Sequence, residues 1–357
     1  FLLPSFEYGG AEKNMILLAN LFSQKGYNID IVVIKDKGGL KNSINNKINI
    51  INLNKSRSLF GIIKLIQYFN KSNSLYHFTS IAHLNLVSIF CSFFTKKNIN
   101  IIVRESNVSF KCFNLRDKIK KLILTYLSKF LYKKTYKIIA ISDAVQAYII
   151  KDLNISSSKV IKINNPINYL DIKSKSNKII YHRFFGKNAK VILTVSSLTK
   201  QKNIPLLLFA FKNILKKINA NLLIIGKGSE YRNLTNLVND LKLTDNVDFI
   251  GNIDNPYPYM KKSDLFILPS FYEGLPNVLI EALACHSNII ATDCPGGSSE
   301  IIKNYGILAK CNDLSDLTSK IISFFDTYKN TTNVNSRYKD FSIEKQFSKY
   351  ESLINEN

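Results

Sequence analysis

A chain of 357 residues is long enough for two domains rather than one. Its hydrophobic fraction of 46% is that of an ordinary folded protein, and no run of 18 or more apolar residues predicts a membrane-spanning helix. The formal net charge of +23 favours an anionic partner: a nucleic acid, an anionic membrane surface or a phosphorylated substrate. The five scattered cysteines form no Cys-x-x-Cys pair, which argues against a disulfide framework or a zinc site and favours a reducing cytoplasm.

Short apolar strands alternate with amphipathic helices along the first half of the chain. This alternation predicts a parallel sheet with helices on both faces. Strands are expected at 28–34, 48–53, 74–78, 99–104, 137–142 and 159–164, and helical patterns at 13–25, 59–71 and 143–153.

The polar segment 170–188 interrupts this rhythm and is interpreted as an interdomain connection. Further strands are expected at 190–196, 221–226, 247–251, 264–269, 288–292 and 305–309, with helices at 204–217, 230–242, 275–285 and 314–327. The pattern predicts two Rossmann-like, doubly wound α/β domains, 1–169 and 189–340, that face each other across a cleft. A last helix within 341–357 is expected to return towards the first domain.

Polar and glycine-rich elements follow several of the predicted strands. In open parallel sheets, ligands bind beyond the carboxyl ends of the strands, and these elements all fall at that edge. They are Gly9-Gly10, Arg104-Glu105, Lys202, Gly226-Lys-Gly228, Glu273-Gly274 and Pro295-Gly-Gly297. Their agreement predicts a ligand site at the carboxyl edge.

The segment 270–281 carries the strongest chemical pattern. Gly274-Leu-Pro276 stands where a helix is expected to begin, and the backbone N–H groups of a helix start favour a diphosphate. Glu273 lies just before that helix and Glu281 about two turns later, so both carboxylates suit the hydroxyls of a sugar and a ribose. A cap at Glu273 and a solvated Glu281 are the structural alternative, which the Gly-Leu-Pro start disfavours.

Segment 270–281 resembles the Glu-x7-Glu motif of the retaining family 4 glycosyltransferases, which have the GT-B fold. Gly9–Lys13 is similar to the N-terminal glycine loop of that family, Ser196–Asn203 to its phosphate-binding segment, and Asp293–Glu300 to its late glycine turn. The resemblance covers nearly the whole chain. It implies a hexosyl- or N-acetylhexosaminyl-transferase of GT-B fold.

The resemblance also implies roles for three side chains. Glu273 would contact the sugar hydroxyls of the donor, Glu281 would hold the ribose hydroxyls, and Lys202 would neutralise the diphosphate leaving group. No metal and no other cofactor is implied, because the lysine and helix N-termini take over charge neutralisation.

Backbone elements complete the implied donor site. Gly274 and Leu275 would assist in binding the diphosphate, and Gly10 would approach the phosphates from the other domain. The turn with Gly226 and Gly228 would border the nucleotide base.

Two positions depart from the family pattern. Ser197 stands where many members carry an arginine, so either Lys200 substitutes or phosphate binding rests more heavily on Lys202. His286 stands where members often carry a glycine after the motif helix, and we interpret it as a C-cap residue in a left-handed conformation.

The first domain offers fewer chemical signals. Glu105 is the candidate for a residue near the reacting carbon, and a structural ion pair between Arg104 and Glu105 is the alternative. His77 and His83 flank a strand end, and the structural interpretation is preferred for both.

The stretch 116–134 predicts an amphipathic helix with apolar residues on one face. Its basic residues are Arg116, Lys118, Lys120, Lys121, Lys129, Lys133 and Lys134. An interfacial helix on an anionic leaflet and a core helix with a solvated back both fit, and the sequence leaves the choice open.

Together with the resemblance, these features predict an enzyme that moves a sugar from a UDP- or GDP-linked donor to a glycan or lipid-linked acceptor, in bacterial surface-polysaccharide biosynthesis. The resemblance implies retention at the anomeric carbon. We expect a cytoplasmic location, or a peripheral one on the inner face of the cytoplasmic membrane. A nucleotide-sugar 2-epimerase of GT-B fold is one alternative. A basic nucleic-acid-binding protein is the weaker one, because no module of basic residues interleaved with stacking aromatics is present.

Overall fold

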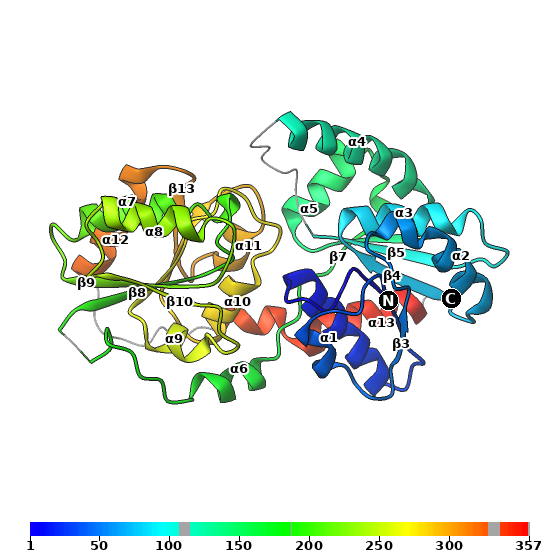
Figure 1. The fold of residues 1–357 in the computed structure, drawn as a ribbon, viewed down its shortest axis with the longest axis horizontal. Coiled ribbons are helices and arrows are strands. Elements are labelled where there is room, and N and C mark those ends of the chain that lie inside the picture. Colours follow the sequence, from blue (N-terminus) through cyan, green and yellow to red (C-terminus); the bar gives the residue numbers. More distant parts are fainter. Residues whose placement is uncertain (107–114, 187, 328–335, 356–357) are drawn as a thin grey trace. The chain divides into compact units, whose positions relative to one another are not determined.

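The computed structural model describes residues 1–106, 115–186, 188–327 and 336–355. The chain divides into two compact units, one of Phe1–Pro166 with Glu344–Asn357 and one of Ile167–Ile343 (Figure 1). Each unit has its own parallel sheet and its own buried core, and each is described by itself.

The first unit is built on a parallel sheet with the order β3-β2-β1-β4-β5-β6-β7 in the part of the chain described. Its strands are β1 (Leu2–Leu3), β2 (Asp30–Val33), β3 (Asn49–Asn52), β4 (Tyr76–Ser80), β5 (Asn100–Glu105), β6 (Lys137–Ala140) and β7 (Val160–Lys162). Most of their residues are buried, as expected for parallel strands covered by helices on both faces.

Helices cover both faces of this sheet. They are α1 (Gly10–Gln24), α2 (Ile62–Lys71), α3 (Ala82–Ser92), α4 (Leu115–Leu131), α5 (Asp143–Ala147) and α13 (Ile343–Asn355). Helices α2, α3 and α4 lie on one face, and α1 and α13 lie on the other (Figure 1). The ring of Phe347 in α13 packs edge-on against that of Phe22 in α1, with the centroids 4.8 Å apart. The helix expected near the end of the chain therefore packs within the first unit.

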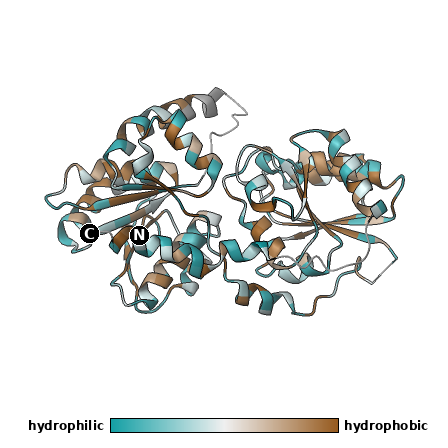
Figure 2. Ribbon diagram, turned by 180° about the vertical axis from the view of Figure 1, so that it is seen from behind, coloured by the Kyte–Doolittle hydropathy of each residue, from teal (hydrophilic) through white to brown (hydrophobic). Residues whose placement is uncertain are grey.

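The second unit has a parallel sheet with the order β10-β9-β8-β11-β12-β13. Its strands are β8 (Lys190–Val195), β9 (Ala220–Ile225), β10 (Val247–Gly251), β11 (Leu265–Leu268), β12 (Ile289–Asp293) and β13 (Ile307–Lys310). Hydrophobic stretches run along the strands of both sheets (Figure 2). All of these strands lie within two residues of the ranges predicted from the sequence.

The helices of the second unit are α6 (Tyr169–Ser176), α7 (Ile204–Ile214), α8 (Tyr231–Asp240), α9 (Tyr257–Lys262), α10 (Asn277–Ala284), α11 (Ser298–Ile302) and α12 (Leu314–Thr327). Helix α7 packs between α8 and α12, and its fully buried Leu207 and Phe211 belong to the main core of the unit. The two α/β units, each with a doubly wound parallel sheet, confirm the predicted fold class.

Two segments differ from the prediction. Segment 170–188 was interpreted as part of the interdomain connection, with no helix predicted in it, and helix α6 occupies its first part within the second unit. The helix begins there because the side chain of Asn168 accepts a hydrogen bond from the backbone N–H of Asp171. The helix expected over 143–153 is α only to Ala147 and continues as one turn of π-helix over Tyr148–Asp152.

Candidate functional site

The strand order of the second unit reverses direction between β8 and β11. From β8 the chain first adds β9 and β10 on one side, and then returns to add β11, β12 and β13 on the other. Such a switch point leaves a crevice beyond the carboxyl ends of the two central strands, where doubly wound proteins bind ligands. The loops that follow β8 and β11 carry Lys202 and Glu273, so the two predicted side chains belong to this place.

Backbone and side-chain hydrogen bonds join these two loops. The backbone N–H of Phe271 donates to the carbonyl oxygen of Gln201 at 2.8 Å, and the side-chain amide of Gln201 donates to the carbonyl oxygen of Tyr272 at 2.9 Å. The loop after β12 is tied in as well, because the backbone N–H of Glu273 donates to the carbonyl oxygen of Pro295 at 2.9 Å. Three neighbouring strand ends therefore form one connected structure.

Lys202 and Glu273 are in direct contact within this structure. Lys202 Nζ lies 2.6 Å from Glu273 Oε1, and the two side chains are only 16% and 6% exposed. Ser270 is fully buried, and its hydroxyl donates to the same Oε1 at 2.6 Å. A carboxylate that accepts hydrogen bonds from an ammonium group and a hydroxyl is held in a fixed orientation, which is what the recognition of substrate hydroxyls requires.

Ser270 is a residue that sequence reasoning missed. Its carbonyl oxygen accepts a hydrogen bond from the hydroxyl of Thr292 at 2.6 Å, so it links the ends of β11 and β12. A serine three residues before a glutamate is a common pairing, and nothing in the sequence shows that the hydroxyl points at that carboxylate.

The predicted glycine turns lie at the same edge and are needed for the loops to pack. Gly226 has a φ of 146°, and a Cβ there would fall 1.8 Å from the carbonyl oxygen of Ser196. Gly296 has a φ of 134°, and its Cβ would fall 2.1 Å from the carbonyl oxygen of Glu273. A Cβ at Gly228 would likewise meet the backbone of Leu198. These positions require glycine whether or not a ligand is bound.

The helix predicted from the Gly-Leu-Pro start is α10. It begins at Asn277, two positions later than expected, and its N-cap residue Pro276 makes no side-chain capping hydrogen bond. Gly274 and Leu275 are buried just before it. The start of a helix directs backbone N–H groups and the positive end of the helix dipole towards an anion.

Glu281 lies within α10, and its Oε1 accepts a hydrogen bond from the hydroxyl of Tyr257 in α9 at 3.4 Å. Lys200 and Ser197 are both exposed on the loop after β8. Lys200 is therefore accessible to a phosphate group, which it would have to bind if it replaces the arginine of many family members.

His286 follows α10 and has the left-handed conformation expected of it, with a φ of 58°. The backbone N–H of His286 donates to Leu283, and that of Ser287 donates to Ala282, both at 3.0 Å. This is the Schellman pattern of a helix C-terminus, so the prediction of a C-cap role is confirmed.

In the first unit, the strand order reverses between β1 and β4. Gly10 is the first residue of α1, after β1, and a Cβ there would meet no atom of the described chain within 4 Å. Glu12 lies in the same helical turn, and burial raises the pKa of its carboxyl group. Ile81 follows β4 with a φ of 78°, a strained conformation for a β-branched residue. Nothing in the sequence around Ile81 indicates this conformation.

Glu105, the last residue of β5, is buried in a hydrogen-bonded network. The hydroxyl of Tyr132 donates to Glu105 Oε2 at 2.6 Å, and Asn85 donates to that hydroxyl at 3.1 Å. Burial, and then the nearby Glu105 carboxylate, raise the pKa of Tyr132. Arg104 donates instead to Ser80 and to Asn165. Neighbouring residues of a strand point to opposite faces, which separates the contacts of Arg104 from those of Glu105.

The two histidines differ in their surroundings. His77 is 3% exposed, lies 3.1 Å from the hydroxyl of Ser88 through Nε2, and packs edge-on against Phe69. Burial lowers its pKa well below 6.5. His83 is exposed in the first turn of α3. His77 therefore has the surroundings of a structural residue.

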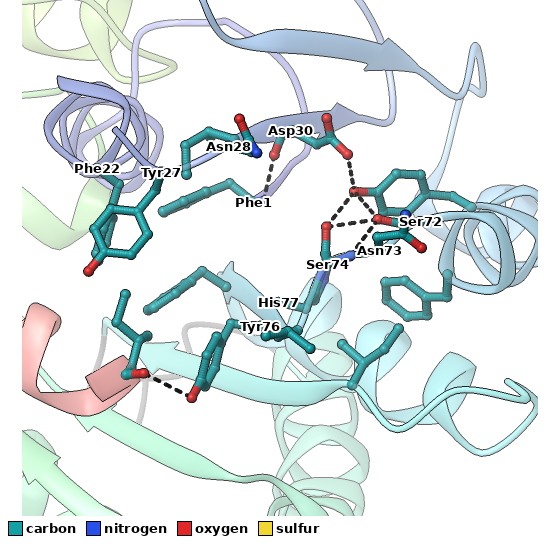
Figure 3. A pocket seen from close by; sticks show the side chains of 17 residues that line it. Phe1, Phe22, Tyr27, Asn28, Asp30, Ser72, Asn73, Ser74, Tyr76 and His77 are labelled. Carbon is teal, nitrogen blue, oxygen red and sulfur yellow. Dashed lines mark hydrogen bonds between the residues drawn. The ribbon is translucent and has the colours of Figure 1, made fainter. Parts of the chain in front are cut away.

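A cavity of about 330 Å³ opens at the opposite edge of the first sheet (Figure 3). It is bordered by Asp30 and Tyr76, the first residues of β2 and β4, and by Tyr68 and Ile354. The hydroxyl of Tyr76 donates to the carbonyl oxygen of Ile354 at 3.1 Å. Because it lies at the amino ends of the strands, this cavity is separate from the candidate site.

Residues 177–340 match the family model for glycosyl transferases group 1. The match covers β8 to β13 together with the Lys202–Glu273 pair and the glycine turns. This stretch of the chain therefore resembles a group 1 glycosyl transferase domain.

Several curated relatives of this chain are named as glycosyltransferases. An uncharacterized glycosyltransferase of Haemophilus influenzae is 27% identical over 99% of this chain and 98% of its own length. Another, from Methanocaldococcus jannaschii, is 34% identical over 48% of this chain, a stretch that spans 51% of that relative. In Campylobacter jejuni, an N-acetylgalactosamine-N,N'-diacetylbacillosaminyl-diphospho-undecaprenol 4-alpha-N-acetylgalactosaminyltransferase is 30% identical over 56% of this chain and 53% of its own.

A solved structure shares the fold along the whole length of this chain. The crystal structure of Anabaena Alr3699/HepE in complex with UDP-glucose superposes with a TM-score of 0.81 at 17% identity, and the match covers 100% of this chain and 99% of that one. Its GT-B fold is therefore that of this chain.

Proposed function

We propose that this glycosyltransferase transfers a hexosyl or N-acetylhexosaminyl group from a nucleotide-diphosphate sugar, with retention at the anomeric carbon. The observation that carries the proposal is the Lys202–Glu273 contact at the switch point of the second sheet, directly before the start of α10. An ammonium group, a helix N-terminus and a fixed carboxylate are the groups that a diphosphate and a sugar need.

In this proposal Lys202 and the first turn of α10 neutralise the charge that develops on the departing diphosphate. Glu273 accepts hydrogen bonds from the sugar hydroxyls, and Ser270 keeps its carboxylate in place. Glu281 binds the ribose hydroxyls, and Lys200 adds a second positive charge near the phosphates. Charge neutralisation by these groups requires no metal ion.

The acceptor is proposed to be a glycan or a lipid-linked sugar, bound by the first unit. The Campylobacter jejuni relative is named for a diphospho-undecaprenol acceptor, which is a lipid-linked glycan. Other relatives are named for the biosynthesis of amylovoran and of capsular polysaccharide. A role in bacterial surface-polysaccharide synthesis at the cytoplasmic face of the membrane follows as part of the proposal. None of the helices in the described ranges is long and apolar enough to cross a membrane.

The test is nucleotide release from a panel of UDP- and GDP-sugars, with membrane extract as the acceptor source. Release that depends on the acceptor and is lost in Glu281→Ala supports the proposal. Release without any acceptor would point instead to a 2-epimerase or a hydrolase. If Glu281→Ala released nucleotide as fast as the wild type, Glu281 would not belong to the donor site.

A further inference from the structure

Helix α4 presents an apolar face that no other element of the described chain covers. Its exposed side chains are Ile119, Leu122, Ile123, Tyr126 and Phe130, which are 51% to 76% exposed. Their spacing places them on one side of the helix, while Ser128 and Leu131 on the opposite side are buried. The helix therefore does not use its apolar face to form the core of the first unit.

The neighbouring helices extend this face. Helix α3 packs between α4 and α2 on one side of the first sheet (Figure 1). The end of α3 exposes Phe93 and Phe94, and the turn Ser58–Gly61 that leads into α2 exposes Leu59 and Phe60, each by 49% to 65%. Exposed apolar side chains scattered singly over a surface are ordinary, but these nine are gathered on three adjacent elements and indicate an interaction surface.

We define the apolar-basic face as the outer side of α4, α3 and α2 together with the turn before α2. Its charged residues are almost all basic. No acidic residue occurs between Asp36 and Glu105, and Asp117 is the single acid of the 116–134 stretch. Exposed basic side chains stand beside each apolar group, with Arg57 before Leu59 and Lys129 before Phe130 among them. The side chains of Lys118, Lys120 and Lys121 lie outside the described part of the structure.

We propose that the apolar-basic face docks on an anionic lipid bilayer. Exposed aromatic and aliphatic side chains interleaved with lysine and arginine fit the boundary between headgroups and acyl chains, where the apolar groups insert and the cations meet anionic headgroups. A second copy of the chain is a poorer occupant, because a two-fold contact would set the same basic residues against each other. The inference rests on the proposed function, since a lipid-linked acceptor has to be reached at a membrane.

Vesicle flotation tests the docking independently of any sugar donor. The probes are vesicles of phosphatidylcholine alone and vesicles that also contain phosphatidylglycerol. We expect the wild-type chain to float with the anionic vesicles and to be released from them by salt. Equal binding to both kinds of vesicle, or no binding to either, would overturn the proposal.

Two exposed apolar residues of α4 provide the sharpest variant. Tyr126→Ser combined with Phe130→Ser removes two inserted side chains without touching the core, and should weaken binding roughly a hundredfold. Ile179→Ser with Tyr181→Ser is the matched control, because those side chains are 80% and 89% exposed in the other unit. An equal loss in both variants would contradict the proposed surface.

Charge is tested by Lys129→Glu with Lys133→Glu, which should weaken binding to anionic vesicles by at least about tenfold. Lys216→Glu with Lys217→Glu changes the net charge equally at exposed positions of the second unit and should have a much smaller effect. If wild type is a dimer in sedimentation and Tyr126→Ser/Phe130→Ser is a monomer, the face holds a second copy and the proposal is wrong.

The docking and the proposed function fail separately. The surface variants should keep wild-type nucleotide release with an acceptor in detergent and lose it with an acceptor in vesicles. Vesicle binding without sugar transfer from any donor would leave the surface standing and remove the function. Sugar transfer without vesicle binding would support the proposed function and contradict the proposed docking surface.

Discussion

The Lys202–Glu273 contact predicts a measurable coupling between the two residues. Lys202→Met leaves the buried Glu273 carboxylate with Ser270 but without its cation. Removal of one partner of a buried ion pair costs about 3–5 kcal/mol, and the remaining Ser270 hydrogen bond reduces this to about 2 kcal/mol. Combining Lys202→Met with Glu273→Gln removes both charges, so most of the lost free energy of unfolding should return.

Urea unfolding of wild type, the two single variants and the double variant gives the coupling energy of the pair. We expect about 2 kcal/mol. Lys190 is the control, because its contact with Asp264 is 3.7 Å long and both side chains are more exposed, at 35% and 23%. Solvent screens such a pair, so Lys190→Met should change the free energy of unfolding by about 0.5 kcal/mol or less.

The same four proteins separate stability from activity. If the pair is the donor site, the double variant is stable but inactive, because neither the diphosphate nor the sugar hydroxyls find their partner. A coupling below about 0.5 kcal/mol would refute the reasoning from burial and distance. A double variant with wild-type nucleotide release would refute the assignment of the site.

Three further predictions concern residues that support the two sites. Ser270→Ala should lower kcat roughly tenfold to a hundredfold with little change in KM, and Ser270→Thr should restore it, since a hydroxyl again fixes the carboxylate. Gly296→Ala should lower the free energy of unfolding clearly more than Gly251→Ala does, and it should abolish turnover. Both glycines have a positive φ, but only a Cβ at Gly296 would clash with the backbone of Glu273. Equal losses of stability in the two variants would contradict this reasoning. Burial lowers the pKa of His77, so its imidazole is neutral in the folded protein and the unfolded chain binds the extra proton. The free energy of unfolding of the wild type should therefore fall as the pH drops below about 6.5, by up to about 1.4 kcal/mol per pH unit. In urea unfolding at acid pH, His77→Asn should flatten this slope and His83→Asn should not.

The sequence predicted the parallel strands well because their buried apolar runs are short and are bounded by polar turns. Helix α3 was not among the helices named from the sequence, because its middle, from Leu84 to Ile89, is buried almost all round and shows no polar face. Helix α6 was missed because its sequence is polar and resembles a linker.

The donor site was predicted as a set of positions, and its contacts were not. Strand ends placed Lys202 and Glu273 at one edge, but the two residues are 71 positions apart, and only the pairing of β8 with β11 brings them within 2.6 Å. The contact of Ser270 with the same carboxylate depends on that geometry as well. For helix α4, periodicity identified an apolar face but could not tell whether another element covers it.

Calorimetric titration with UDP and with GDP tests the central claim most directly. The wild-type chain should bind one of the two nucleoside diphosphates, and Lys202→Ala should weaken that binding at least about tenfold, because it removes a charge-assisted contact to the phosphates. Lys212→Ala, which changes an exposed lysine of α7, should bind as wild type does. Binding of neither nucleotide, or equal binding by wild type and Lys202→Ala, would contradict the assignment of the donor site.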